Sequence, residues 1–236
     1  MKIVDEGIII SKSIFGETSL IIKIFSSKYG IISGLYKGGL TSKNKYLLEL
    51  GNIVDFEKSS RLDSQLGMLK IDLKESYLFN IFHNKLKLTI LITMLDLIKA
   101  FIVEKENIED FYFLTKNLII ILQKEDEIKN YLLWELKLLE AIGFGLDLSK
   151  CVITLKEEGL YYLSPKTGKS VIKDVGEAYH NKLFIIPKFF LDIKEENIAI
   201  KDLELGFKIN THFLDNFAKE YNKIIPSSRN NIMKIK

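Results

Sequence analysis

Residues 7–37 read GIIISKSIFGETSLIIKIFSSKYGIISGLYK, and this stretch decides the fold class. It holds three short runs rich in isoleucine, leucine and phenylalanine, separated by glycine- and serine-containing turns, which is typical of β-strands. Two similar runs follow, NIVDFEKS at 52–59 and MLKIDLKE at 68–75. In the last run Leu69, Ile71 and Leu73 alternate with charged residues and should face inward. Five short, mostly antiparallel strands predict a small barrel of the oligonucleotide/oligosaccharide-binding (OB) type, although an SH3-like barrel would give nearly the same pattern.

After about Tyr77 the hydrophobic period becomes helical. Within residues 84–101 one face is polar and the opposite face is apolar; the polar face holds Lys85, Thr89, Thr93 and Asp96, and the apolar face holds Leu86, Ile90, Met94, Leu97 and Phe101. Further helices are expected at about 109–122, 127–142 and 199–223, with a β-hairpin inserted at about 150–175. The sequence therefore predicts an α+β protein, with a barrel domain at 1–78 and a mostly helical domain at 79–236.

Composition excludes several classes of protein. The net charge is only +3, and Cys151 is the single cysteine, so neither an intrachain disulfide nor a Cys₄ zinc site can form, and we expect a cytoplasmic protein. The most apolar stretch, 88–103, is interrupted by Asp96 and Lys99 and is shorter than a bilayer span. The sequence has no H-E-x-x-H motif, no complete phosphate-binding loop and no recognisable nucleophile–base pair. We therefore expect no enzyme activity.

One segment of the barrel region carries charge of a single sign. Between Glu17 and Glu49 the sequence contains no acidic residue. The segment instead interleaves lysines with aromatic residues, a composition that suits a groove for single-stranded nucleic acid. Ordinary exposed lysines on hairpins, with the aromatic residues in the core, are the alternative interpretation. The candidate DNA-binding residues are Lys23, Lys28, Lys37, Lys43, Lys45, Tyr36 and Tyr46.

The succession of motifs resembles the bacterial recombination mediator family RecO over nearly the whole chain. Residues 7–45 resemble its N-terminal OB domain, with FGE at 15–17, KYG at 28–30 and a KGG…SKNK loop at 37–45. Residues 60–77 are similar to its closing hairpin, and Leu133–Cys151 to the helix and glycine turn before its zinc-ribbon-like insert. SPKTGKSV at 164–171 and IPKFFL at 186–191 resemble rickettsial-type, alphaproteobacterial members.

The resemblance implies a non-catalytic function in DNA repair and recombination, in the RecF-type pathway. RecO-like proteins bind single- and double-stranded DNA, anneal complementary strands and, with RecR, help load the RecA recombinase onto coated single strands. They also bind the acidic C-terminal tail of the single-stranded-DNA-binding protein. By this resemblance the lysine segment is the DNA-binding face, and the protein would be associated with the nucleoid.

The chain departs from the family at the insert. Many members carry four zinc-binding cysteines there, but only Cys151 keeps such a position, and Thr154 stands where the second cysteine would fall. Structural zinc needs four ligands, so we expect no cofactor and an insert held by packing of Leu155, Leu160, Tyr161 and Tyr162.

Two further surfaces are candidates for binding. A pocket for an acidic peptide needs apolar side chains rimmed by cations; the candidates are Lys85, Lys87, Lys99, Phe82 and Phe101. The tail residues Lys223, Arg229, Lys234 and Lys236 could form a second DNA contact, or remain a solvated end. Two other functions stay open. The chain could be a protein adaptor that does not touch DNA, or a fragment of a nucleic-acid enzyme such as a nuclease or ligase.

Overall fold

The computed structural model describes residues 2–40, 45–61, 66–104, 106, 108–123 and 127–234. The chain forms two compact units, one made of Met1–Glu127 with Pro226–Lys236 and the other of Ile128–Ile225. Helices α1 to α3, described below, therefore belong to the same unit as the N-terminal strands. Among the described residues, no helix combines the length and the apolar character needed to cross a membrane.

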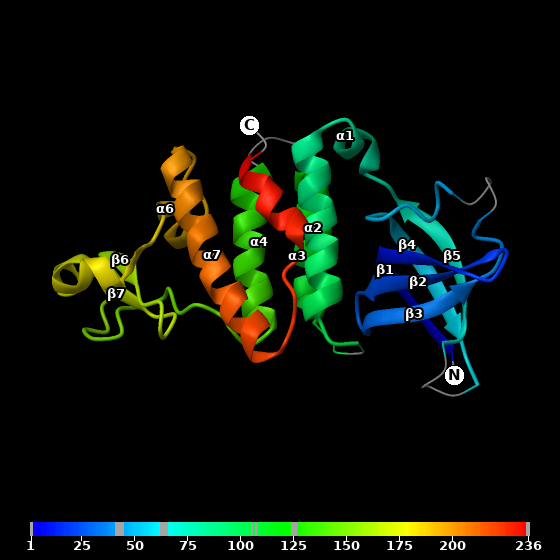
Figure 1. Ribbon diagram of the computed structural model, residues 1–236, viewed down its shortest axis with the longest axis horizontal. Coiled ribbons are helices and arrows are strands. Elements are labelled where there is room, and N and C mark those ends of the chain that lie inside the picture. The colour runs from blue at the N-terminus through cyan, green and yellow to red at the C-terminus, as the bar shows by residue number, and fades with distance from the viewer. Residues whose placement is uncertain are drawn as a thin grey trace. The chain divides into compact units, whose positions relative to one another are not determined.

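The N-terminal strands close into a five-stranded barrel (Figure 1). The strands are β1 (Lys2–Phe15), β2 (Ser19–Ser26), β3 (Gly30–Tyr36), β4 (Ile53–Ser59) and β5 (Met68–Glu75). Their order around the barrel is β1-β2-β3-β5-β4. Strand β1 is long enough to pair with β2 through Gly7–Phe15 and with β4 through Lys2–Ile8. The ring closes where Leu35 of β3 pairs with Met68 of β5 in parallel. This is the strand order of an OB barrel, so the expected fold class is confirmed.

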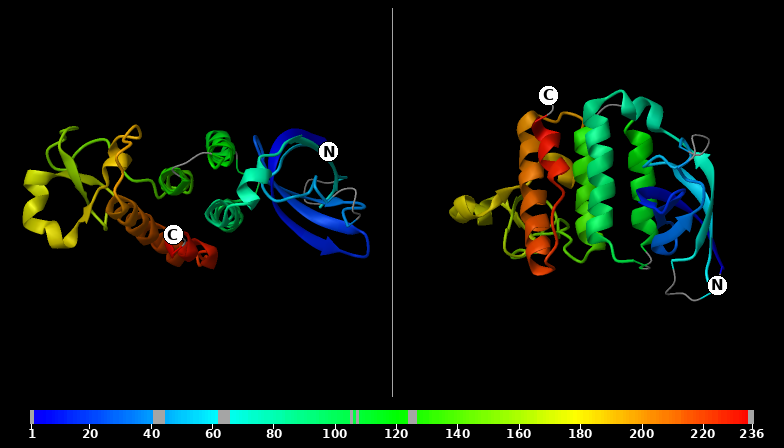
Figure 2. Two further views of the ribbon diagram at one scale, coloured as in Figure 1. Left: turned by 90° about the horizontal axis from the view of Figure 1, so that it is seen from above. Right: turned by 45° about the vertical axis from the view of Figure 1, so that its right-hand side comes forward.

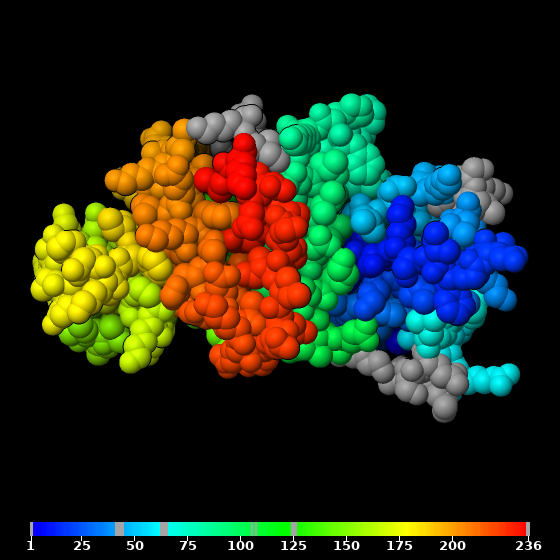
Figure 3. All heavy atoms as spheres, viewed as in Figure 1, coloured from blue at the N-terminus to red at the C-terminus, as the bar shows by residue number. Residues whose placement is uncertain are grey.

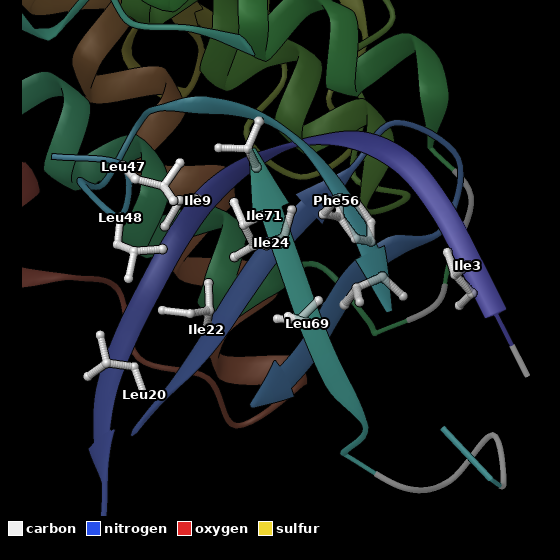
Figure 4. Packing of buried hydrophobic residues seen from close by; sticks show 12 residues of the cluster. Ile3, Ile9, Leu20, Ile22, Ile24, Leu47, Leu48, Phe56, Leu69 and Ile71 are labelled. Atoms are coloured by element: carbon white, nitrogen blue, oxygen red, sulfur yellow. The ribbon is translucent and has the colours of Figure 1, made fainter. Parts of the chain in front are cut away.

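Alternation along the strands fills the barrel interior (Figure 4). The interior residues include Ile3, Ile9, Leu20, Ile22, Ile24, Leu47, Leu48, Phe56, Leu69 and Ile71. The predicted inward positions Leu69 and Ile71 are confirmed, but that of Leu73 is wrong, because its side chain is exposed. Leu73 lies beside a register shift between β4 and β5, where strict alternation breaks down.

Three helices follow the barrel in the same unit: α1 (Leu78–Phe82), α2 (Lys85–Phe101) and α3 (Glu109–Ile121). Figure 2 shows α2 and α3 as neighbouring helices beside the barrel. Asn84 begins α2 by accepting a hydrogen bond from the backbone N–H of Lys87. The predicted apolar face of α2 is buried from Ile90 to Phe101, but Thr93, which we expected on the polar face, is buried as well.

The C-terminal tail forms a 3₁₀ helix, η3 (Ser227–Lys234), that packs against α2. Its atoms lie beside those of α2 in Figure 3. Arg229 in this helix is only 1% exposed, so it does not belong to a solvated end, whereas Lys223 and Lys234 are exposed. Lys236 lies outside the described residues.

The second unit combines helices with a small sheet. Its elements are α4 (Glu127–Ala141), β6 (Leu160–Leu163), β7 (Ser170–Ile172), α5 (Lys173–Gly176), η2 (Glu177–Lys182), β8 (Phe184–Ile185), α6 (Lys188–Leu191) and α7 (Ile200–Glu220). The sheet has the order β7-β6-β8, so the expected hairpin gains a third strand. Cys151, Tyr162 and Val171 form its buried cluster. Leu155 was expected in this packing, but its side chain is 65% exposed.

Candidate nucleic-acid interface

The candidate lysines occupy different parts of the β2–β3 hairpin. Ser26 pairs with Gly30 at the turn, and Leu20 pairs with Tyr36 at the other end. Six residues along a strand span about 20 Å. Lys28 lies in the turn and Lys37 follows the far end, so the structure does not bring these two cations together.

Four candidate residues gather at the far end of the hairpin, and we call them the barrel mouth: Tyr36, Lys37, Lys45 and Tyr46. Burial raises the pKa of Tyr36, and the charges of Asp72 and Tyr46 raise it further. Tyr36 is half buried against the barrel core. Tyr46 is 67% exposed. Lys37 and Lys45, which adjoin Tyr36 and Tyr46 in the sequence, are also exposed. Lys43 lies outside the described residues.

The chain around the barrel mouth is anchored from both sides. On one side Gly38 has a φ of +71°, a conformation that favours glycine. A Cβ atom on the next residue, Gly39, would lie 2.8 Å from Leu20 Cδ1, so the glycine at 39 lets the backbone approach the Leu20 side chain closely. On the other side the Asn52 side-chain amide donates hydrogen bonds to the carbonyl oxygens of Tyr46 at 2.7 Å and Leu47 at 3.1 Å. These contacts hold the Tyr46 backbone while its ring stays exposed.

The structure adds an aromatic residue that the sequence analysis did not select. Ile14 pairs with Leu20, which in turn pairs with Tyr36, so the end of β1 lies at the same end of the barrel as the mouth. Phe15, the last residue of β1, is half exposed there. The following Gly16 has a φ of +66° and marks the turn. In the sequence, a glycine directly after Phe15 was the one signal that this aromatic residue lies at the end of a strand.

Part of the outer face of β2 and β3 is covered within the same unit. Phe25 is fully buried against α3, with ring centroids 6.1 Å from Phe111 and 5.6 Å from Tyr112. In the middle of the face, Lys23 Nζ forms an ion pair of 3.2 Å with Glu104 Oε1. In the β2–β3 turn, the backbone N–H of Lys28 donates to Asp5 Oδ2, while the Lys28 side chain is exposed.

The five candidate peptide-binding residues do not converge on one pocket. Phe82 and Lys85 are both exposed where α1 meets α2. Lys99 and Phe101 lie about 20 Å away at the other end of α2, by helical rise. Phe101 is only 2% exposed, and Lys99 pairs with Asp96 at 2.7 Å. Lys87 is largely buried and pairs with Glu127 at 3.3 Å.

The insert does not offer the ligands of a structural zinc site. Burial opposes ionisation of the Cys151 thiol, but hydrogen bonds from the Thr154 hydroxyl and from the backbone of Thr154, Ile172 and Ile153 lower its pKa to about 7. Such a thiolate could be one ligand, yet zinc in structural sites takes four. Within the part of the chain that the structure describes, no group of three or more His, Cys, Asp or Glu side chains is arranged to hold a metal ion.

Comparison with known proteins identifies relatives along nearly the whole chain. Sequence profiles described as "Recombination protein O N terminal" and "Recombination protein O C terminal" match residues 1–77 and 83–216. The DNA repair protein RecO of Rickettsia canadensis is 34% identical over 223 residues, which cover 94% of this chain and 92% of the relative. The DNA repair protein RecO of Wolbachia pipientis subsp. Culex pipiens is 32% identical over 237 residues, with 98% and 97% covered. The barrel, the helical unit and these relatives together show that the chain belongs to the recombination protein O (RecO) family of DNA repair proteins.

Proposed function

We propose that this protein is a non-catalytic recombination mediator that binds DNA at the barrel mouth. In this role it binds single- and double-stranded DNA, anneals complementary strands and helps load a recombinase onto coated single strands. The observation that supports the proposal is that two exposed lysines, Lys37 and Lys45, are the chain neighbours of Tyr36 and Tyr46, and that Tyr46 is one of the groups whose charge acts on Tyr36. Cations beside aromatic faces are the usual means of holding single strands without reading their sequence.

The mechanism follows from the charge of the substrate. Two complementary strands repel one another, and lysines that neutralise phosphates reduce this repulsion and release counterions. Contacts to phosphates carry no base information, so binding tolerates any sequence. The tyrosine rings supply stacking surfaces for unpaired bases, and this stacking is given up when the bases pair with the complementary strand.

Salt dependence tests the proposal directly. Fluorescence anisotropy of a labelled oligonucleotide, titrated at several salt concentrations, gives the slope of log K against log salt. Each phosphate contact to a single strand contributes about 0.7 to this slope. The double variant Lys37→Ala/Lys45→Ala should therefore bind more weakly and flatten the slope by about 1.4. Lys43, in the same sequence segment, can be added as a third substitution.

A matched control uses Lys166→Ala/Lys182→Ala, which removes the same charge from two exposed positions of the second unit. This control should leave most of the slope unchanged. If the control and the mouth variant reduce the slope of log K against log salt by the same amount, the barrel mouth is not the binding site. If the wild-type protein ignores oligonucleotides even at low salt, the protein is an adaptor rather than a DNA-binding mediator. Cleavage or joining of labelled DNA with Mg²⁺ would instead indicate an enzyme.

Protein partners form the second part of the proposal. We include RecR and the acidic C-terminal tail of the single-stranded-DNA-binding protein, and we place the protein with the nucleoid in the cytoplasm. Among the peptide candidates, the exposed pair Phe82 and Lys85 supports a contact with an acidic peptide. Phe82→Ala should weaken binding of a labelled acidic peptide that ends in phenylalanine. Phe113→Ala, at a similarly exposed ring on α3, is the control and should bind as the wild type does.

A further inference from the structure

The outer face of β2 and β3 is the surface that OB barrels commonly use for oligonucleotides. Here this face has three parts. Phe25 and Ile31, near the hairpin turn, are fully buried. Lys23 and Ser33 pair with each other across the middle of the hairpin. Beyond them, Ile21 and Leu35 are only half buried and lead towards the barrel mouth.

A carboxylate from the chain segment between α2 and α3 occupies the middle of this face. Oε1 of Glu104 lies 3.2 Å from Lys23 Nζ and accepts a hydrogen bond of 3.4 Å from the Ser33 hydroxyl. A phosphate oxygen would use the same two groups, an ammonium and a hydroxyl. Both partners of the ion pair remain accessible, since the side chains of Lys23 and Glu104 are 38% and 55% exposed.

The backbone fixes Glu104 in this position. Glu104 forms β-bridges with Gly30 and Ile31 at the start of β3. The following acidic residue, Glu106, lies so close that a Cβ atom on Gly30 would be 2.4 Å from its carbonyl oxygen. The carboxylate is therefore held over the face rather than reaching it from a free loop.

We propose that Glu104 is an internal competitor for DNA phosphate at Lys23, which limits the DNA-binding surface to the barrel mouth until the carboxylate is displaced. This inference rests on the proposed DNA-binding function. An exposed ion pair is weak and screened by salt. A DNA strand that is already bound at the barrel mouth can therefore displace the Glu104 carboxylate from Lys23. Exchange of one anion for another at Lys23 adds little affinity while Glu104 remains charged.

The test is the variant Glu104→Gln, which keeps the size of the side chain and a hydrogen-bond acceptor for Ser33 but removes the charge. It should bind a labelled single-stranded oligonucleotide about two- to fivefold more tightly at low salt, the range expected for release of one exposed ion pair. It should also steepen the salt slope by about 0.7, equal to one added phosphate contact.

Asp96→Asn is the matched control, because it removes the same charge from another exposed ion pair, that of Asp96 with Lys99 on α2. It should leave the affinity unchanged. In addition, Lys23→Ala should cancel the gain when combined with Glu104→Gln.

Three results would overturn the inference and leave the proposed function standing: Glu104→Gln binds like the wild type, Asp96→Asn binds as tightly as Glu104→Gln, or the gain survives Lys23→Ala. In each case the Lys37→Ala/Lys45→Ala variant would still lose affinity. The proposed function fails separately, and the inference with it, if neither the wild type nor Glu104→Gln binds DNA at low salt.

Discussion

Nζ of Lys116 on α3 lies 3.0 Å from Oε1 of Glu6 on β1, and the same ammonium lies 3.0 Å from Oε1 of Glu75 on β5. One cation thus joins a helix to two strands, β1 and β5, that lie on either side of β4 in the barrel. The Tyr112 hydroxyl donates a further hydrogen bond of 2.7 Å to Glu6, and Lys74 pairs with Glu6 at 2.7 Å. This polar cluster is the main electrostatic connection between the barrel and α3 among the described residues.

Removal of the shared cation should destabilise the first unit. In Lys116→Met two carboxylates would remain close together and partly buried without their common partner; the Glu6 side chain is only 15% exposed. Loss of one partner from such a charge-assisted network costs about 2–3 kcal/mol. Urea unfolding would measure this change in the free energy of unfolding. Lys99→Met, which breaks the exposed pair with Asp96, should cost no more than about 1 kcal/mol; equal losses in the two variants would contradict the assigned importance of the cluster.

The same cluster predicts acid sensitivity. Burial would raise the pKa of Glu6, but hydrogen bonds from Lys74, Tyr112 and Lys116 outweigh it and lower the pKa from 4.5 to about 2. Because the folded-state pKa lies below the unfolded value, the stabilisation is fully present above about pH 4.5 and is lost as the pH falls towards 2. The loss amounts to at most about 3 kcal/mol.

Urea titrations at pH 7, 4.5, 3 and 2 would reveal this loss as a falling free energy of unfolding. Glu6→Gln cannot titrate, so its stability should start lower at pH 7 and fall less steeply on acidification. Glu75, whose pKa is lowered first by Tyr77 and then by Lys116, should leave some pH dependence in that variant. Parallel curves for the wild type and Glu6→Gln would show that Glu6 does not carry the effect.

Much of the fold could be predicted from the sequence because it depends on local patterns. The strand runs at 7–14, 20–27, 30–37, 52–59 and 68–75 correspond to β1–β5, and the helical periods correspond to α2, α3, α4 and α7. The alternation of Leu69 and Ile71 with charged residues correctly identified buried positions. Where local pattern and tertiary packing disagree, the packing decides: Thr93 has a polar side chain, yet its position on α2 is enclosed.

The candidate site was less predictable, because it depends on contacts between distant segments. Nothing local to Lys23 indicates that Glu104, 81 positions later, would pair with it. Likewise nothing local to Asp5 indicates that it accepts hydrogen bonds from Ser27 and Lys28 of the β2–β3 turn. Charge along the sequence therefore indicated a basic segment but could not show which of its lysines lie together.

Stacking and charge at the barrel mouth should be separable by mutation. Tyr46→Ala removes an exposed ring without removing charge, so it should weaken single-strand binding by about 1–3 kcal/mol while the salt slope stays as in the wild type. Stability should change little, because the ring is mostly exposed. Anisotropy titrations at several salt concentrations give both quantities. Tyr179→Ala, at an exposed tyrosine of the second unit, should bind normally; an unchanged affinity for Tyr46→Ala would remove the ring from the site.

The insert offers a prediction in the stabilising direction. Leu155 has a φ of 60°, a left-handed conformation that costs a residue with a Cβ atom about 1–2 kcal/mol. Its backbone N–H donates to the Cys151 carbonyl oxygen at 2.9 Å, which fixes the turn, while its side chain is mostly exposed and contributes little burial. Glycine relieves this strain but adds freedom to the unfolded chain worth about 0.5–1 kcal/mol. Leu155→Gly should therefore stabilise the second unit by about 0.5–1 kcal/mol net, measured as a higher urea midpoint.

Ile153→Gly is the matched control, because Ile153 is equally exposed but is not among the residues with positive φ in the described chain. There glycine only adds freedom to the unfolded chain, and the variant should be destabilised by about 0.5–1 kcal/mol. The two substitutions remove a similar exposed aliphatic side chain from the same turn, so opposite signs would isolate the backbone conformation as the cause. If Leu155→Gly is instead destabilised as much as Ile153→Gly, the left-handed conformation at 155 is not maintained in solution.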